Sequence, residues 1–283
     1  MGVGSGKVIL LGEHAVVYGH RAIAVAVSRG TRVTLTARGG PTALGDSDIR
    51  DERLARALAV ALPDWGYRVD IETDLPVGRG MGSSAALTIA LLRARAAAEG
   101  RPVDFAWLHR EGFAVEAIFH GTPSGLDHAV AALGGAVLYR RDEPPLPVDM
   151  APLSAVVLDS GTAGDTAVEV ARVRAGRPAN EGLLKRLGQL VEHSVGHLHD
   201  APALGAAMDE AHGVLGELGV STPGLDELVA LARRHGAHGA KLSGAGGGGI
   251  VLALVDDPGS LLRAAKRQGL RALTCTLPPP EGA

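Results

Sequence analysis

The chain has 283 residues and a formal net charge of -3, with 46% hydrophobic and 21% charged residues. A chain of this length buries a large core and lies near the size at which one core divides into two domains. The small negative charge and the 3% of aromatic residues argue against a nucleic-acid partner, which would need a basic stripe or aromatic rings on which bases stack.

Cysteine content and hydrophobic run length predict where the protein resides. The single cysteine, Cys275, excludes an internal disulfide framework and fits a reducing compartment. The apolar run near the N-terminus is too short for a signal peptide, and no stretch has the length needed to span a bilayer. We therefore expect a soluble, cytoplasmic protein without a membrane partner.

Hydrophobic periodicity predicts strands and helices in mixed order along the first half of the chain. Apolar or alternating runs indicate strands, and spacings of three and four residues indicate helices. The predicted strands are residues 7–11, an apolar run ending at residue 27, and residues 31–37, 67–73 and 136–140. The predicted helices are residues 51–62, 85–99, 104–120 and one that begins at residue 124, with Gly121 and Pro123 ending the third. Residues 38–47, rich in Gly, Pro and Asp, are a predicted loop.

A proline-rich run at residues 142–152 lacks periodicity and is the best candidate for a domain boundary. We place the two domains at residues 1–150 and 151–283. The second half predicts a strand at residues 153–159, helices between 166 and 235, a strand at 250–255, a helix from 258 and a last strand at 271–277. Because strands and helices alternate irregularly and no repeat is visible, the predicted fold class is α+β.

Residues 76–88 (PVGRGMGSSAALT) lie between a predicted strand and a predicted helix. The glycines at 78, 80 and 82 allow a tight turn and a close approach of ligand to backbone, and the first N–H groups of a helix favour an anion. The residues alone leave two interpretations open. The segment is either a phosphate-binding loop or a plain turn in which Ser83 is the N-cap of the helix.

Two other glycine patterns do not fit the nucleotide-binding motifs that they suggest. The GSGK at residues 4–7 lacks the first glycine, the following Ser or Thr and the preceding strand of a Walker-type loop. Gly244, Gly246 and Gly249 match G-x-G-x-x-G, yet a strand follows them, whereas the dinucleotide-binding motif opens a helix.

Three charged residues each admit a structural and a chemical interpretation. Asp127 can close a capping box with Ser124, Glu116 can be a solvated helix residue, and Lys7 can be a solvated lysine at a strand end. Together with two glycine-rich loops, however, they supply the groups that phosphoryl transfer needs. These are phosphate donors, a ligand for a divalent ion, a cation and a proton acceptor.

With these residues in place, the chain resembles the GHMP kinase superfamily and, within it, the mevalonate kinases. The resemblance covers nearly the whole chain and rests on GKVILLGEHAVVYGHRAIAVAV, PVGRGMGSSAAL, EAIFHGTPSGLDHAVAALGGAVLY and KLSGAGGGGIVLAL, with a weaker match at LGVSTPGLDEL. It implies a two-domain α+β fold with the active site in the cleft between an N-terminal ATP-binding domain and a C-terminal domain. It also implies ATP and Mg²⁺ as cofactors, and it is compatible with a homodimer.

The activity implied by the resemblance is transfer of the γ-phosphate of ATP to the 5-hydroxyl of mevalonate, a step of isoprenoid precursor synthesis. One alternative is a GHMP kinase with another acceptor, such as phosphomevalonate or a sugar. The GEHAVVYG segment favours mevalonate, and no additional Lys or Arg cluster for a phosphorylated acceptor is evident. A nucleotide-binding regulator without catalysis is a second alternative, against which the presence of both Lys7 and Asp127 argues.

The resemblance also assigns roles to individual residues. The residues expected around the ATP phosphates are Gly78, Arg79, Gly80, Met81, Gly82, Ser83 and Ser84, together with Gly244 and Gly246 of a motif at residues 241–249 that packs against this loop. Ser84 and Glu116 would reach Mg²⁺, which leaves Ser83 as the helix cap. Asp127 would accept the proton of the substrate hydroxyl, and Lys7 would lower the pKa of that hydroxyl and keep Asp127 ionised. Glu13, His14 and Thr166 would lie near the acceptor.

The chain departs from the family pattern two positions before Thr166, where the family usually has a basic residue. Here that position is Gly164, followed by Asp165, which leaves open how the carboxylate of mevalonate is held. The segment between residues 37 and 67 is short for the family, so no adenine-binding residues are assigned.

Four histidines outside the matched roles were also considered. His193 and His197 are four residues apart on a predicted helix but lack the glutamate of H-E-x-x-H, so they are not assigned to a zinc site. His120 and His128 flank the Asp127 turn and are expected to be surface or capping residues.

Overall fold

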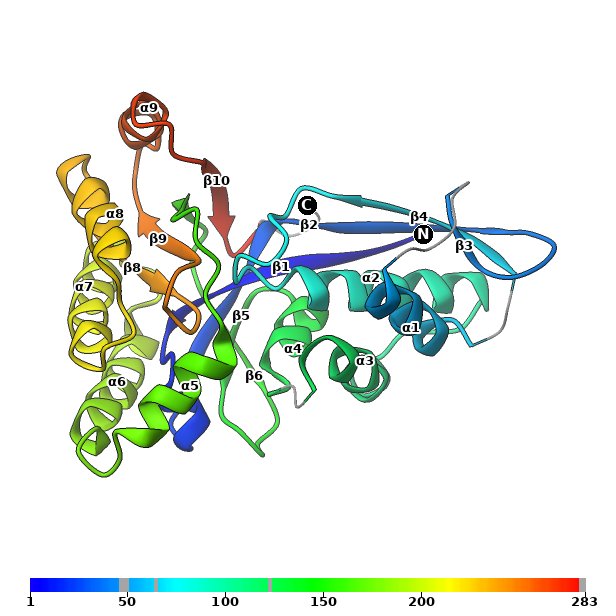
Figure 1. The fold of residues 1–283 in the computed structure, drawn as a ribbon, viewed down its shortest axis with the longest axis horizontal. Helices are drawn as coiled ribbons and strands as arrows, with labels where there is room; N and C mark the ends of the chain where they lie inside the picture. The colour runs from blue at the N-terminus through cyan, green and yellow to red at the C-terminus, as the bar shows by residue number, and fades with distance from the viewer. Residues whose placement is uncertain (46–50, 64–65, 122–123, 280–283) are drawn as a thin grey trace. The chain divides into compact units, whose positions relative to one another are not determined.

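The computed structural model describes residues 1–45, 51–63, 66–121 and 124–279. The elements follow the chain in the order shown in Figure 1. They are β1 (Gly2–Leu11), the 3-10 helix η1 (Ala15–Tyr18), β2 (Ala22–Ala37), β3 (Ala43–Leu44), α1 (Glu52–Ala61), β4 (Tyr67–Thr73), α2 (Ser83–Ala98), α3 (Phe105–His120), α4 (Leu126–Leu133), β5 (Ala136–Tyr139), β6 (Leu146–Val148), β7 (Leu153–Asp159), α5 (Thr166–Ala175), α6 (Glu181–Ser194), the 3-10 helix η2 (Val195–His197), α7 (Ala201–Glu217), α8 (Pro223–Arg234), β8 (Gly239–Ser243), β9 (Ile250–Leu254), α9 (Gly259–Arg267) and β10 (Ala272–Leu277).

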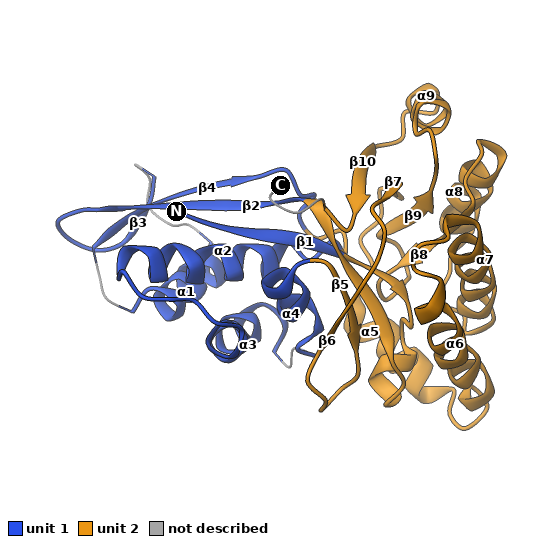
Figure 2. Ribbon diagram, turned by 180° about the vertical axis from the view of Figure 1, so that it is seen from behind, with its two compact units in different colours: residues 1–7, 29–77, 81–134 blue, residues 8–28, 78–80, 135–283 orange. Residues whose placement is uncertain are grey.

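The chain divides into two compact units that are interleaved in sequence (Figure 2). Unit 1 comprises residues 1–7, 29–77 and 81–134, and unit 2 comprises residues 8–28, 78–80 and 135–283. The division passes through β1 and β2, so each unit contains a part of both strands. The domain boundary expected after residue 150 falls inside unit 2, and as a division into family domains it stays a prediction.

Unit 1 is built from helices α1 to α4 on one face of its strands (Figure 2). Residues 31–37 of β2 pair antiparallel with residues 67–73 of β4, and β3 pairs parallel with β4. Val33 and Val69 of these strands share one buried cluster with α1, α2 and α3, to which Leu58, Ile89 and Leu108 contribute. Helix α2 is apolar on nearly all sides because it lies in the middle of this layer, with Leu91 and Leu92 fully buried.

Unit 2 contains an antiparallel four-stranded sheet in the order β10-β7-β9-β8. Helices α7 and α8 lie against β8, and α6 packs on α7 (Figure 1). Residues 22–25 of β2 pair with β5 in the same unit, and β5 pairs with β6. The residues of β8 and β9 are buried throughout, as expected for strands covered by helices.

Most predicted elements are confirmed, and β4 and β7 have the predicted bounds. The apolar run to residue 27 and the predicted strand 31–37 are, however, one strand, β2. The polar break at residues 28–30 hides this continuity. Gly30 is needed there because a Cβ at this position would lie 2.4 Å from the carbonyl oxygen of Gly4 in β1, and a glycine inside a strand often marks such a close backbone approach.

Two predicted loops contain short strands. The proline-rich run at residues 142–152 includes β6, in which Pro147 is tolerated because β6 lies at the edge of its sheet. The predicted loop at residues 38–47 includes β3, and its residues 46 and 47 lie outside the described part of the chain. Pro123, the expected stop after α3, also lies outside it.

Helix starts differ in how they are capped. Asp51 and Asp104 cap α1 and α3 by accepting hydrogen bonds from backbone N–H groups, each at 2.8 Å. Helices α2 and α4 instead begin after Gly82 and Gly125, and neither has a side-chain cap. The prediction that Ser83 is the cap of α2 is therefore wrong, since Ser83 is already the first residue of the helix. Within the described ranges, no helix has both the length and the apolar character needed to cross a bilayer.

Candidate active site

Lys7 and Asp127 form an ion pair inside unit 1. The Lys7 Nζ lies 3.2 Å from Oδ1 of Asp127, and the two side chains are 6% and 35% exposed. Lys7 therefore is not a solvated strand-end lysine, because its side chain extends from β1 into the interior of the unit. Asp127 lies in the first turn of α4 and is paired with Lys7, so the capping-box interpretation of this residue is also wrong.

The glycine loop is joined to β1 by the backbone and by close packing. The Lys7 N–H donates to the carbonyl oxygen of Met81 at 3.0 Å. Gly82 has φ 68, and a Cβ there would lie 2.8 Å from Cγ of Lys7. Glycine is thus required at position 82 both by its left-handed backbone and by the lysine side chain that passes it. Met81 is 1% exposed, so its side chain is not available to a ligand.

Glu116 is buried and accepts two hydrogen bonds from α2. Thr88 Oγ1 donates to its Oε1 at 2.8 Å and Ser84 Oγ to its Oε2 at 3.2 Å. The side chain is 1% exposed, so the solvated interpretation of Glu116 is wrong. Burial raises the pKa of Glu116 to about 7, and the nearby Asp127 carboxylate acts in the same direction.

The donor set formed by Glu116 and Ser84 fits a magnesium ion. Mg²⁺ commonly binds proteins through one or two carboxylates, keeps several waters and takes further oxygens from substrate phosphates. A buried carboxylate whose pKa is raised lacks compensating positive charge, and a divalent cation supplies that charge. Across the described residues, no cluster of three or more His, Cys, Asp or Glu side chains forms a complete protein cage for a metal.

His128, next to Asp127, is a core residue. It is 1% exposed, with its ring 4.7 Å from that of His109 and 5.7 Å from that of Phe113, so the expectation of a surface or capping role is wrong. Burial, together with the neighbouring His109, lowers the pKa of His128 to about 4. His120, in contrast, has a half-exposed side chain, and its Nε2 lies 3.0 Å from Ser84 Oγ.

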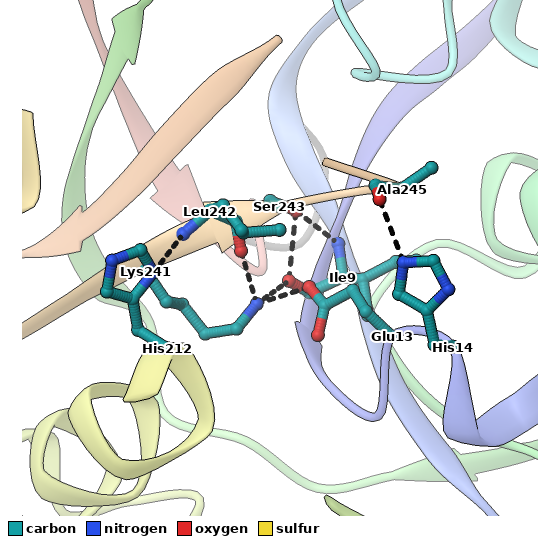
Figure 3. Close-up of polar contacts among 8 residues, drawn as sticks. All are labelled: Ile9, Glu13, His14, His212, Lys241, Leu242, Ser243 and Ala245. Atoms are coloured by element: carbon teal, nitrogen blue, oxygen red, sulfur yellow. Dashed lines mark hydrogen bonds and ion pairs between the residues drawn. The ribbon is translucent and has the colours of Figure 1, made fainter. Parts of the chain in front are cut away.

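In unit 2, the expected acceptor residues Glu13 and His14 contact the third motif (Figure 3). The Glu13 Oε1 pairs with the Nζ of Lys241, and His14 Nε2 contacts the carbonyl oxygen of Ala245 at 2.8 Å. His14 has φ 59, in the left-handed region that few residues other than glycine adopt. The sequence analysis did not identify the Glu13–Lys241 pair. A lysine in the middle of a short strand that leads into a glycine motif is a signal for it, because a buried lysine requires a carboxylate partner.

The glycines of the third motif pack against the loop residues that belong to unit 2. A Cβ at Gly80 would lie 3.5 Å from the Ser243 carbonyl oxygen, and one at Gly249 would lie 3.7 Å from that of Arg79. The Arg79 Nε is 3.4 Å from Oδ2 of Asp159, an ion pair that the sequence analysis also did not identify. Gly78 and Gly244 have left-handed φ values of 72 and 110, with open space where a side chain would be.

The absence of a basic residue at position 164, two residues before Thr166, has a steric cause. A Cβ at this position would lie 2.2 Å from the carbonyl oxygen of Gly246, so the backbone of the third motif leaves no room for a basic side chain. Asp165 is the N-cap of α5 and accepts hydrogen bonds from the N–H groups of Ala167 and Val168. Thr166 is the first residue of this helix and is exposed.

The structure therefore forms two groups from the predicted site residues, each within its own unit. Unit 1 holds Lys7, Met81, Gly82, Ser83, Ser84, Glu116 and Asp127. Unit 2 holds Glu13, His14, Gly78, Arg79, Gly80, Thr166, Gly244 and Gly246.

Comparison with known proteins identifies the family. Residues 52–135 match the GHMP kinases N terminal domain, and residues 184–269 match the GHMP kinases C terminal domain. The mevalonate kinase of Thermococcus gammatolerans is 34% identical over a match that covers 92% of this chain and 90% of the relative. The chain belongs to the GHMP kinase family. As a GHMP kinase, it is an ATP-dependent small-molecule kinase, which confirms the predicted reaction class.

A second relative supports the family assignment, and a solved structure tests the predicted fold. The mevalonate kinase of Pyrococcus horikoshii is 34% identical, with 88% of this chain and 86% of the relative covered. The crystal structure of L. major mevalonate kinase in complex with R-mevalonate superimposes with a TM-score of 0.91 at 29% identity, covering 98% of this chain and 95% of that chain. The predicted α+β GHMP kinase fold is confirmed.

Replacing Gly82 with alanine tests the contact between the loop of this GHMP kinase and Lys7. The left-handed φ alone costs about 1–2 kcal/mol of stability, and the new Cβ also displaces Lys7. Gly100→Ala is a matched control, because Gly100 follows the same helix with φ 63 and open space around it. Urea unfolding should show a loss of stability for both variants, larger for Gly82→Ala, whereas kcat should fall at least ~10-fold only for Gly82→Ala. An equal kcat in the two variants would contradict a role for this contact.

The buried His128 predicts acid sensitivity in this GHMP kinase. Its pKa in the folded protein, about 4, is below the unfolded value of 6.5, so the unfolded chain binds more protons between these values and stability is lost as the pH falls from 6.5 to 4. The loss amounts to at most about 3 kcal/mol. His128→Leu removes this titration but leaves His109 and Asp127 in place. Urea unfolding across this pH range should give a flatter profile for the variant, and parallel profiles would show that His128 does not titrate as proposed.

Proposed function

We propose that this GHMP kinase transfers the γ-phosphate of ATP to the 5-hydroxyl of mevalonate, giving 5-phosphomevalonate. The observation that carries the proposal is the ion pair between the buried Lys7 and Asp127 in unit 1, beside a glycine loop whose helix has no side-chain cap. Mevalonate kinases at 34% identity over most of the chain support mevalonate as the acceptor.

Asp127 is the proposed proton acceptor. Its carboxylate is partly exposed, whereas the ammonium of its partner Lys7 is almost fully buried. A buried cation acts over a short distance with little screening, so Lys7 holds the Asp127 carboxylate in place and lowers the pKa of a substrate hydroxyl bound beside it. Asp127 takes the hydroxyl proton as the new oxygen–phosphorus bond forms.

The glycine loop is the proposed phosphate-binding element. Because α2 begins at Gly82 without a side-chain cap, its first N–H groups are free of a competing carboxylate or hydroxyl and suit an anionic ligand. Met81 contributes only backbone, and Arg79 is held by Asp159. We therefore propose backbone N–H groups, with a smaller part for side chains, as the donors to the ATP phosphates.

Ser84 and Glu116 are the proposed protein ligands of Mg²⁺, which when bound neutralises charge on the phosphates. In the protein, Thr88 donates to Glu116 Oε1 and fixes the orientation of the carboxylate. The raised pKa of Glu116 means that metal binding is coupled to loss of its proton.

Glu13, His14 and Thr166 are the proposed acceptor-binding residues. A phosphorylated acceptor such as phosphomevalonate would call for additional Lys or Arg side chains, for which the chain offers no evident cluster. A cytoplasmic location, expected from the single cysteine and the short apolar runs, and a homodimer, compatible with the resemblance, complete the proposal.

Mevalonate should give the fastest ADP release when mevalonate, phosphomevalonate and galactose are compared as acceptors. Asp127→Asn should lower that rate at least ~10²-fold, because the general base is lost, and should leave ATP affinity nearly intact. A coupled ADP assay and nucleotide titration measure the two quantities. A panel without preference for mevalonate would refute the substrate, and an unchanged rate in Asp127→Asn would refute the base.

The two adjacent serines separate metal binding from helix stability. Ser84→Ala removes the hydroxyl that contacts Glu116 and should raise the Mg²⁺ concentration at half-maximal activity several-fold. Ser83→Ala is the matched control at the first residue of the same helix and should leave that concentration unchanged. If Ser84→Ala lowers only the melting temperature, Ser84 is a structural residue.

A further inference from the structure

Lys241 lies immediately before the third glycine motif but is not exposed to a ligand. It is 0% exposed, and its Nζ contacts three oxygens: Glu13 Oε1, the Leu242 carbonyl at 2.6 Å and the Ile9 carbonyl at 3.5 Å. An ammonium group has three donors, so these three oxygens account for all of them. Lys241 therefore has no donor left for a phosphate group.

The segment from Lys241 to Ala245 holds the segment from Ile9 to His14 through further contacts (Figure 3). Ser243 Oγ accepts a hydrogen bond from the Ile9 N–H and donates one to the Ile9 carbonyl oxygen, both at 3.0 Å. His14 contacts the carbonyl oxygen of Ala245 at 2.8 Å. Bonds at both ends of the segment keep Glu13 and His14 in place, including the left-handed backbone of His14.

These contacts leave two buried atoms without a hydrogen-bond partner in the described part of the chain, Glu13 Oε2 and His14 Nδ1. The Ala245 carbonyl can only accept, so Nε2 of His14 donates to it. Burial lowers the pKa of His14, so its ring is neutral and its Nδ1 is an acceptor. Both free atoms are therefore acceptors, and a buried acceptor without a partner is costly unless a ligand supplies a donor.

We propose that Lys241 is a positioning residue that holds the Glu13–His14 segment so that a hydroxyl group of the acceptor substrate donates to one of its two free acceptor atoms. This rests on the proposed function. Mevalonate has two hydroxyls, and the 3-hydroxyl, which does not react, is the one assigned to this contact. A carboxylate lacks a donor and does not suit these acceptor atoms.

Lys241→Met tests the proposal, with Lys266→Met as control because Lys266 is exposed on α9. The loss of Lys241 should raise KM for mevalonate at least ~10-fold and leave KM for ATP within about twofold, because the effect passes through Glu13 alone. Equal changes in both KM values, as for a general loss of structure, would overturn the proposal.

A double variant gives a second test if Lys241→Met does not fold. Removing both charges of a buried pair is better tolerated than removing one. If Lys241 acts through Glu13, Glu13→Gln and Glu13→Gln/Lys241→Met should have the same KM for mevalonate within about twofold. A double variant with a much higher KM than Glu13→Gln would show that Lys241 acts by another route.

The hydroxyl assignment is tested with 5-hydroxy-3-methylpentanoate, which lacks the 3-hydroxyl of mevalonate. The unmodified enzyme should show a KM at least ~10-fold higher for this compound than for mevalonate, and Glu13→Gln should reduce that ratio. Equal KM values in the unmodified enzyme would overturn the assignment. Failure of the proposed function is distinguishable from both outcomes, because the unmodified enzyme would then not turn over mevalonate at all.

Discussion

The burial of Lys7 is the constraint on which the site in unit 1 depends. An ammonium group 6% exposed requires a carboxylate, and Asp127 at 3.2 Å is that partner. The lysine stem passes Gly82 so closely that no side chain fits there, which removes any cap from the start of α2. The same constraint therefore fixes the position of Asp127, the left-handed turn of the glycine loop and the uncapped N–H groups of the helix.

Unit 2 contains a second buried lysine, Lys241, whose pairing differs from that of Lys7. Its ammonium is fully buried and saturated by three oxygens, whereas the partner of Lys7 remains one-third exposed. A lysine whose three donors are all used fixes structure, and an ion pair with an exposed member presents that member to a ligand. Lys7 and Lys241 each lie beside a glycine-rich loop. The partner of Lys7 is partly exposed and the partner of Lys241 is buried, so the proposed role of Lys7 is catalytic and that of Lys241 is positioning.

The sequence predicted those elements that depend on interactions between residues close together in the chain. The alternation in β4 depends on neighbours within a few residues, and this strand has the predicted bounds. The burial of Glu116 and His128 depends instead on packing against α2 and α3, which no local pattern encodes. The pattern around Glu116 therefore left a solvated residue open, and His128 was expected to be a surface or capping residue. Likewise, Glu13 and Lys241 are separated by 228 residues, and only the fold places them together.

The geometry around Gly164 restricts how mevalonate can be held. A Cβ there would overlap the Gly246 carbonyl oxygen, so the basic residue that relatives have near this position has no steric equivalent in this chain. Glu13 and His14 offer only acceptors, and a carboxylate needs donors. Under the proposed function, the carboxylate of mevalonate must therefore meet other groups. The hydroxyl of the exposed Thr166, at the start of α5, is a donor with the required chemistry, and the backbone N–H of Thr166, which Asp165 does not occupy, is a second donor.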